Sequence, residues 1–230
     1  MAQRRSKWFA FVRSLVRNFF FKPLGGITTI GEENIPLEGA LLFAPNHVSH
    51  LDPPISACAQ NRRQLTFMSK EEMFKIPIMG PLIRSLGAFP IRRGESDTES
   101  IRKAISLLDE GRAVLIFPEG TRGDGKTFQP INRGVAMLAK RTGALVQPVG
   151  IIGTHIVWPK GPFKLKRHRM IVAFGKPFTY AETATFATEK ENRESFTKEL
   201  TARIMVLCEA NGMPLKISSE AEPQSPALSQ

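Results

Sequence analysis

Seven short apolar runs constrain the fold of this chain more than any other feature. They are five to eight residues long, which is the usual length of a strand, and turn residues or helical segments separate them. Strands that alternate with helices are typical of an α/β domain. The expected strands are residues 26–30, 40–44, 64–68, 87–91, 113–117, 144–151 and 169–174.

Helix signals lie between and after these runs. Ser96 and Glu99 have the spacing of a capping box, an apolar stripe follows at helical spacing, and Gly111 ends the pattern. Two further helices are expected at 133–141 and 188–210.

The length and composition suit one compact domain, because 230 residues with 42% apolar content are enough to bury a core. We expect an α/β domain over residues 26–212, with a central mixed, largely parallel sheet flanked by helices. Residues 213–230 contain Pro223 and Pro226 among polar residues, and we expect a disordered tail there.

The first 25 residues predict an amphipathic helix that ends at Pro23 and lies at an anionic membrane surface. It is too short and too charged to span a bilayer. The alternative is a helix that packs on the protein's own core. Polar residues Arg13, Ser14, Arg17 and Asn18 fall opposite the apolar face, which consists of Trp8, Phe11, Val12, Leu15, Val16, Phe19 and Phe20.

The net charge of +11 indicates an anionic partner, which is nucleic acid, a phospholipid surface or a phosphorylated substrate. Charge alone does not choose among them. Cys58 and Cys208 lie far apart without paired spacing, so neither a disulfide framework nor a metal site is predicted, and a reducing compartment is favoured.

His47 and Asp52 form the most suggestive chemical pair, since they follow the apolar run 40–44 directly. A carboxylate on Nδ1 of an imidazole leaves Nε2 free to act as a general base. Five positions apart, the two side chains need a loop or a helix start to meet. Ser49 and His50 are less favoured, because the spacing to Asp52 selects His47.

Three more polar segments follow predicted strands, where open α/β sheets place their sites. They contain Lys70, the pair Arg92 and Arg93, and the run 119–122. Taken singly, each is more typical of a solvated loop. Residues 120–127 also match a Walker A pattern, but Pro130 would interrupt its helix and no aspartate follows Asp124 to hold magnesium.

Together these segments resemble the 1-acylglycerol-3-phosphate (lysophosphatidic acid) acyltransferase family of glycerolipid acyltransferases. The resemblance covers about residues 30–176. Many relatives have Asp where this chain has Arg92, and the register favours Arg93 as the phosphate contact. The matching motifs are Asn-His-x-x-x-x-Asp ending at Asp52, and the segments 69–77, 87–93, 117–122 and 146–149.

The resemblance implies a glycerol-3-phosphate acyltransferase-like fold and transfer of a fatty acyl group to the sn-2 hydroxyl of 1-acyl-glycerol-3-phosphate, which gives phosphatidic acid. The donor would be acyl-CoA or acyl-acyl carrier protein, with no cofactor and no metal. His47 would be the general base and Asp52 its orienting carboxylate, with no enzyme serine needed. The implied phosphate-binding residues are Lys70, Arg93, Glu119, Gly120, Thr121 and Arg122.

Such an enzyme would work peripherally at the cytoplasmic face of a membrane, without nucleic acid as a partner. Three alternatives stay open at this point. An acyltransferase for another lysophospholipid or glycolipid would share every motif. A lipid hydrolase or thioesterase would need the base but no phosphate-binding arginines, and a basic nucleic-acid or membrane-binding module would leave His47 and Asp52 unused.

Overall fold

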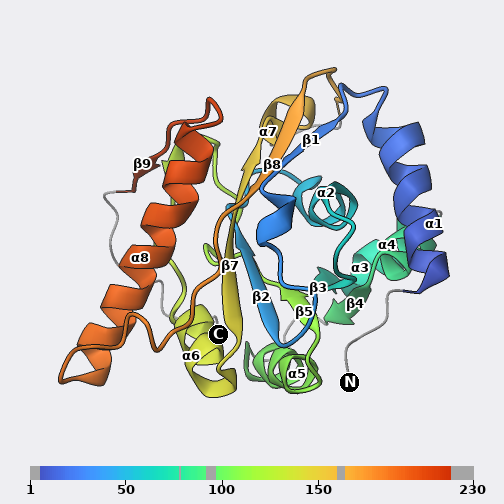
Figure 1. Ribbon diagram of the computed structural model, residues 1–230. Coiled ribbons are helices and arrows are strands. Elements are labelled where there is room, and N and C mark those ends of the chain that lie inside the picture. The colour runs from blue at the N-terminus through green and yellow to red at the C-terminus, as the bar shows by residue number, and fades with distance from the viewer. Residues whose placement is uncertain (1–5, 78, 92–96, 160–163, 219–230) are drawn as a thin grey trace, which may run out of the picture.

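A seven-stranded sheet organises the computed structural model, which describes residues 6–77, 79–91, 97–159 and 164–218 (Figure 1). The strand order is β1-β8-β7-β2-β5-β3-β4. All neighbouring strands run parallel except β7 and β8, which are antiparallel. The strands are β1 (Ile27–Ile30), β2 (Leu41–Pro45), β3 (Leu65–Lys70), β4 (Ala88–Ile91), β5 (Ala113–Leu115), β7 (Leu145–Ile152) and β8 (Met170–Phe174).

The structure confirms all seven predicted strands and the mixed, largely parallel sheet. The expected strand 113–117 is shorter and ends at Leu115. The central strand β2 shows why the runs are continuously apolar: its five residues are all buried. Leu41 and Phe43 pack toward one face of the sheet, and Leu42 and Ala44 pack toward the other.

Helices cover both faces of the sheet (Figure 1). The predicted helices are found as α5, α6 and α8, and the capping box of α8 joins Thr188 to Glu191. Ser96, the expected cap of α5, lies outside the described residues. One face carries α1 (Lys7–Val16), α2 (Asp52–Ala59), α3 (Glu71–Lys75) and α4 (Met79–Ser85), and the other carries α5 (Asp97–Asp109), α6 (Arg133–Thr142) and α8 (Glu189–Glu209).

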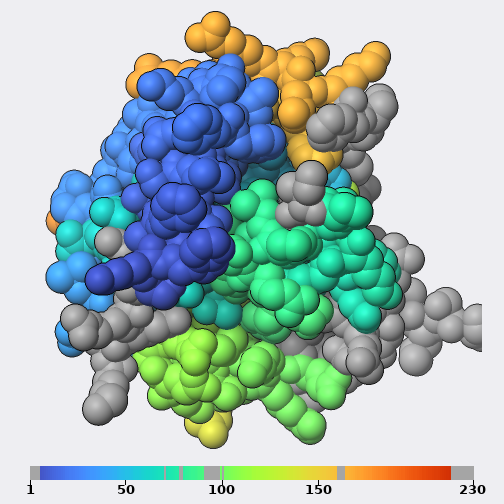
Figure 2. All heavy atoms as spheres, turned by 90° about the vertical axis from the view of Figure 1, so that its right-hand side faces the viewer, coloured from blue at the N-terminus to red at the C-terminus, as the bar shows by residue number. Residues whose placement is uncertain are grey.

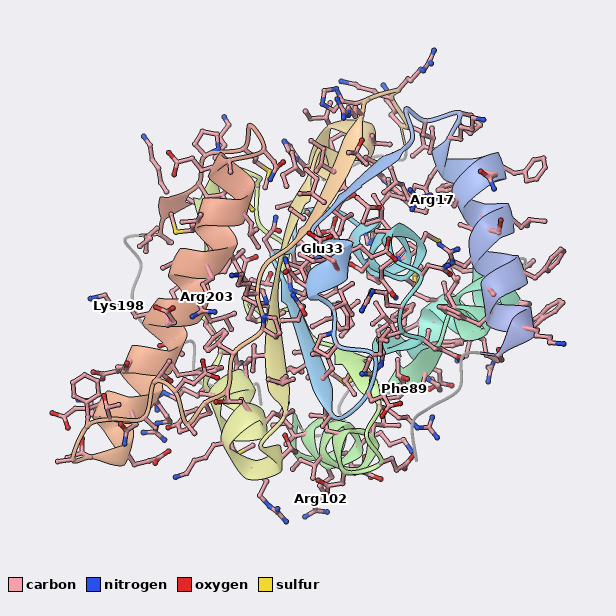
Figure 3. The ribbon with its side chains drawn as sticks, in the orientation of Figure 1. Arg17, Glu33, Phe89, Arg102, Lys198 and Arg203 are labelled. Atoms are coloured by element: carbon pink, nitrogen blue, oxygen red, sulfur yellow. The ribbon has the colours of Figure 1, made fainter. Side chains whose placement is uncertain are left out.

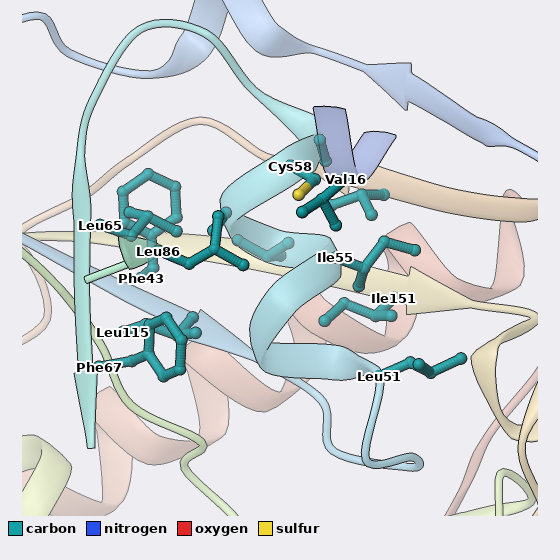
Figure 4. Packing of buried hydrophobic residues seen from close by; sticks show 14 of the residues in the cluster. Val16, Phe43, Leu51, Ile55, Cys58, Leu65, Phe67, Leu86, Leu115 and Ile151 are labelled. Carbon is teal, nitrogen blue, oxygen red and sulfur yellow. The ribbon is translucent and has the colours of Figure 1, made fainter. Parts of the chain in front are cut away.

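The core beneath α2 fixes the helix that carries Asp52. Figure 4 shows Ile55 and Cys58 of α2 among strand side chains such as Phe43 and Leu65, all of them fully buried. Burial raises the pKa of the Cys58 thiol to about 12, so this thiol stays protonated and unreactive. The packing therefore makes α2 a rigid support for the loop that precedes it.

The N-terminal helix packs on the protein's own core along one side, as one of its two alternatives predicts, and the membrane contact stays a prediction. Val12 and Val16 are buried against the domain, whereas Trp8, Phe11 and Phe19 are 62%, 57% and 79% exposed. A short π-helix, η1 (Arg17–Phe21), extends α1. The helix is thus docked on one side and presents an aromatic stripe on the other.

Arg13 and Arg17 point toward the protein, although the helical pattern places them opposite the apolar face. Arg17 donates to the carbonyl oxygens of Cys58 at 2.8 Å, Ala59 at 3.3 Å and Ile27 at 3.1 Å (Figure 3). Arg13 donates to the same carbonyl of Cys58 at 3.3 Å. These cations satisfy the last carbonyls of α2, where a positive charge also complements the helix dipole.

Residues 213–218, which the sequence predicts to be part of a disordered tail, pack on the domain instead. Met213 and Leu215 are 5% and 8% exposed. A two-residue strand, β9 (Lys216–Ile217), pairs with β6 (Thr127–Phe128) in a second small sheet. The chain after α8 therefore packs on the domain as far as residue 218, and residues 219–230 lie outside the described part.

Candidate active site

The loop between β2 and α2 is pinned to β7 before it reaches His47. Asn46 is buried, and its side chain donates to the carbonyl of Ile151 at 2.9 Å and accepts the N–H of Ile151 at 2.7 Å. These two hydrogen bonds satisfy the backbone N–H and carbonyl of Ile151 as a neighbouring strand would, although β2 has already ended. His47 is therefore held at the carboxyl edge of the sheet.

His47 and Asp52 are in contact, as their spacing and the need for a helix start predicted. Nδ1 of His47 lies 2.9 Å from Oδ2 of Asp52, which is the first residue of α2. The same oxygen accepts the N–H groups of Val48 at 2.6 Å and Ser49 at 2.7 Å. The carboxylate directs the Nδ1–H tautomer and leaves Nε2 as a proton acceptor. That the pair is catalytic stays a prediction.

The Asp52 carboxylate is fully buried, and its second oxygen also has a donor. The hydroxyl of Thr154 donates to Oδ1 at 2.6 Å. Thr154 belongs to the short helix α7 (Thr154–Val157), directly after β7. Sequence reasoning missed this residue, although a hydroxyl three positions after the predicted strand 144–151 is the kind of signal that selected the other segments.

The chain after β5 wraps around His47. The ring of Phe117 stacks on the imidazole with centroids 3.9 Å apart and an interplanar angle of 20°. Glu119 is buried, and its two oxygens accept the N–H of His47 at 2.8 Å and the N–H of Gln129 at 2.9 Å. Burial outweighs these hydrogen bonds and raises the pKa of Glu119 to about 7.

Four parallel strand ends bring the predicted phosphate-binding segments to one edge, because β2, β5, β3 and β4 are neighbours in that order. Lys70 is the last residue of β3 and pairs with Ile91 of β4. The structure does not describe the side chain of Lys70, and Arg92 and Arg93 lie outside the described residues. Beyond β5, Thr121 is exposed and Arg122 is half-buried.

A pocket with a volume of about 720 Å³ is lined in part by His47, and this volume is within the range of small-molecule sites. Its walls come mainly from α6 and from the chain at 115–120, with α5 and α8 contributing two residues each, and they are largely apolar. Gly120 lies at its rim with a positive φ of 68°, which favours glycine. Other lining residues include Met68, Ile101, Ala104, Leu115, Asn132, Val135, Leu138, Lys140, Glu189 and Arg193.

Neither a metal cluster nor a membrane span is found in the part of the chain that the structure describes. No three His, Cys, Asp or Glu side chains are grouped there in a way that would hold a metal ion. None of the described helices is both long enough and apolar enough to cross a bilayer.

A family model described as Acyltransferase matches residues 26–152, which is more than half of the chain. The chain is 27% identical over 200 residues to the chloroplastic 1-acyl-sn-glycerol-3-phosphate acyltransferase LPAT1 of Arabidopsis thaliana, and 85% of the chain is matched. It spans only 56% of the length of that relative.

Two bacterial relatives are matched over more of their own length. A 1-acyl-sn-glycerol-3-phosphate acyltransferase of Bacillus subtilis is 29% identical over 183 residues, with 80% of this chain and 88% of the relative covered. The crystal structure of the 1-acyl-sn-glycerophosphate acyltransferase PlsC from Thermotoga maritima has a TM-score of 0.72 and 27% identity, and covers 89% of this chain and 80% of the relative.

Proposed function

Since this chain belongs to the acyltransferase family, we propose that it transfers a fatty acyl group to the sn-2 hydroxyl of 1-acyl-glycerol-3-phosphate. The donor is a thioester, acyl-CoA or acyl-acyl carrier protein, and the product is phosphatidic acid. One observation carries the proposal: His47, in contact with Asp52, lines a largely apolar pocket. The relatives named for this activity support the same acceptor.

The geometry suits direct transfer without an acyl-enzyme. Nε2 of His47 removes the proton of the acceptor hydroxyl while that oxygen attacks the thioester carbonyl carbon. The resulting tetrahedral species collapses, the carbon–sulfur bond breaks, and the imidazolium returns its proton to the departing thiolate. Asp52 holds Nδ1–H and stabilises the imidazolium, so no nucleophilic serine takes part.

The pocket beside His47 is the proposed site of an acyl chain. Its walls of Met68, Ile101, Ala104 and Leu138 would remove methylene groups from water, which stabilises binding by about 0.8 kcal/mol per buried CH₂. A chain bound there could place its carbonyl near the imidazole, because His47 is one of the residues that line the pocket. Holding both reactants supplies much of the remaining rate enhancement.

The acceptor's phosphate is proposed to lie at the shared edge of β2, β5, β3 and β4. Lys70, Arg93 and Arg122 supply the positive charge, and Gly120 and Thr121 supply backbone and hydroxyl donors. The order of the strands supports this set, because each residue comes at or just after a strand end on that edge.

Replacing Arg93 by alanine should mainly raise the KM of the acceptor, by about tenfold to a hundredfold, because a phosphate contact is made before and during the reaction. The kcat should change little. The neighbouring Arg92→Ala variant is the matched control and should keep the KM of the wild-type protein. Steady-state kinetics at several acceptor concentrations measure both parameters, and a raised KM in Arg92→Ala alone would assign the phosphate to the other arginine.

The acceptor and the product are amphiphiles, so we propose that the enzyme works peripherally at the cytoplasmic face of a membrane. The aromatic stripe of α1 supports this arrangement, since large apolar side chains gather on an open face of the molecule. Figure 2 shows α1 in dark blue running across that face, beside α3 and α4. The exposed members of the stripe are Trp8, Phe11, Leu15, Phe19 and Phe20.

Substituting serine for both Phe11 and Phe19 should weaken binding to anionic vesicles by about tenfold or more, because each ring gains apolar burial in the interface. Deleting the whole helix is a poorer test, since Val12 and Val16 belong to the core. Val206→Ser is the control, because Val206 is 63% exposed on α8. Vesicle co-sedimentation measures the change, and unaltered binding of the double variant would refute the role of the stripe.

A purified assay that crosses labelled acyl donors with lysophospholipid acceptors tests the function itself. We expect phosphatidic acid from 1-acyl-glycerol-3-phosphate and far less product from acceptors without a phosphate monoester. Product only with another lysolipid would reassign the acceptor. Release of free fatty acid would indicate a hydrolase, and salt-sensitive DNA binding without acyl transfer would indicate a nucleic-acid-binding module.

A further inference from the structure

Glu119 holds the backbone of the proposed base. Its Oε1 accepts the N–H of His47 at 2.8 Å across a sequence separation of 72 residues, and the side chain is 7% exposed. The bond has a counterpart, because the N–H of Gly123 donates to the carbonyl oxygen of His47 at 2.7 Å. Both backbone polar groups of His47 are therefore tied to the segment 119–123.

The other oxygen of Glu119 holds a third segment. Oε2 accepts the N–H of Gln129 at 2.9 Å, between β6 and the start of α6. The N–H of Asn132 donates to the carbonyl of Pro118 at 2.8 Å, which is a second hydrogen bond between residues 129–132 and residues 118–119. Since Asn132 and the first turn of α6 line the pocket at His47, one carboxylate joins the base to the pocket wall.

We propose that Glu119 is a positioning residue, whose carboxyl group sets the backbone of His47 and thereby the direction from which Nε2 meets the acceptor hydroxyl. The inference deepens the proposed function and rests on it. It differs from the role that family resemblance gives Glu119 among the phosphate-binding residues. Both acceptor oxygens already have backbone donors, and a carboxylate aimed at a phosphate would also repel it.

The surroundings of Glu119 agree with this role. Burial is the main cause that raises its pKa to about 7, and the nearby charges of Asp52 and Asp124 act in the same direction. The N–H groups of Gln129 and His47 oppose the rise. Burying a carboxyl group costs free energy unless each oxygen receives a hydrogen bond, and the two backbone N–H groups supply one bond to each oxygen.

Glu119→Gln tests the proposal, because the amide keeps the shape but presents an NH₂ donor to one of the two backbone N–H groups. We expect kcat to fall about 100-fold, as for a small misplacement of a catalytic group, with the KM of both substrates within about threefold of wild type. In a His47→Ala background the same change should have little further effect on kcat. Glu194→Gln, at an exposed pair with Lys190 on α8, is the control.

An unchanged kcat with a tenfold or larger rise in the acceptor KM would overturn the proposal, because Glu119 would then contact the acceptor. The proposal would also be overturned if Glu119→Gln lowered kcat in the His47→Ala background as much as it does in the wild-type protein. These outcomes require an active wild-type protein, and a wild-type protein without acyl transfer would instead refute the proposed function.

Amide hydrogen exchange on the wild-type protein tests the same contacts without turnover, and it applies even if Glu119→Gln does not fold. The amides of His47 and Gln129 should exchange at least roughly 100-fold more slowly than in an unstructured chain. Saturating glycerol 3-phosphate, as a probe of the acceptor headgroup, should leave both rates unchanged. Fast exchange of both amides, or loss of protection with the probe, would overturn the positioning role.

Discussion

His47→Ala should lower kcat by about 100-fold to 10,000-fold, because proton transfer by a positioned base contributes a factor of this size. The fold should survive, since His47 lies in the loop between β2 and α2 and its side chain, which is 16% exposed, does not belong to the hydrophobic core. Asp52 also keeps its hydrogen bonds from Val48, Ser49 and Thr154 when the ring is removed. Initial rates with a labelled acyl donor and a circular-dichroism melt measure the two effects.

His50→Ala is the matched control for this result. His50 lies three residues further along the same loop and is exposed, with its ring tilted against Trp158 at 5.2 Å between centroids. Its removal should leave kcat within a few fold of wild type. Full activity of purified His47→Ala protein would end the proposed mechanism, and a large loss in His50→Ala alone would move the base to that histidine.

Asp52→Asn should reduce kcat by about 1,000-fold to 10,000-fold with only modest loss of stability. The negative charge that stabilises the imidazolium is lost, and the same change behind the histidine of a serine-protease triad, where the tautomer also changes, costs about 10,000-fold. The amide oxygen can stay where Oδ2 accepts from Val48 and Ser49, and the NH₂ group can donate to the hydroxyl oxygen of Thr154. Kinetics together with chemical denaturation separate the two quantities.

Thr154→Val gives the comparison that isolates the charge of Asp52. This variant keeps the carboxylate and its contact with His47 but leaves Oδ1 without the hydroxyl donor. The free energy of unfolding should fall by about 1–3 kcal/mol, the cost of an unpaired buried acceptor. Its kcat should fall far less than that of Asp52→Asn. Equal losses of kcat in the two variants would contradict an electrostatic role for Asp52.

Several short elements could not be predicted, and their sequences show why. Helix α2 begins with Asp52 followed by two prolines, a pattern typical of a turn, although proline is also tolerated in a first helical turn. The two-residue strands β6 and β9 are too short for any periodicity. Residues 127–128 form β6, where a Walker A site would require a helix.

The sequence of α1 also did not predict which of its residues would be buried against the domain. The sequence of that helix predicts an apolar face with Arg13 and Arg17 opposite it, at an anionic membrane surface. The carbonyl groups of Cys58, Ala59 and Ile27 turn Arg17 inward instead, and the apolar set divides into buried and exposed members. A helical pattern shows which residues share a side, whereas the neighbouring elements decide which side is covered.

The sequence by itself determined the strands, the main helices and the pairing of His47 with Asp52, because apolar periodicity and spacing along the chain are local properties. Only the tertiary structure decided that Thr154 supports Asp52, that α5 and α6 enclose a pocket at His47, and that Glu119 binds the backbone of that histidine. The last contact joins residues 72 positions apart and exists because β2 and β5 are paired in one register, with Phe43 opposite Leu115. No local pattern records such a register, since it is set by how whole strands and helices pack together.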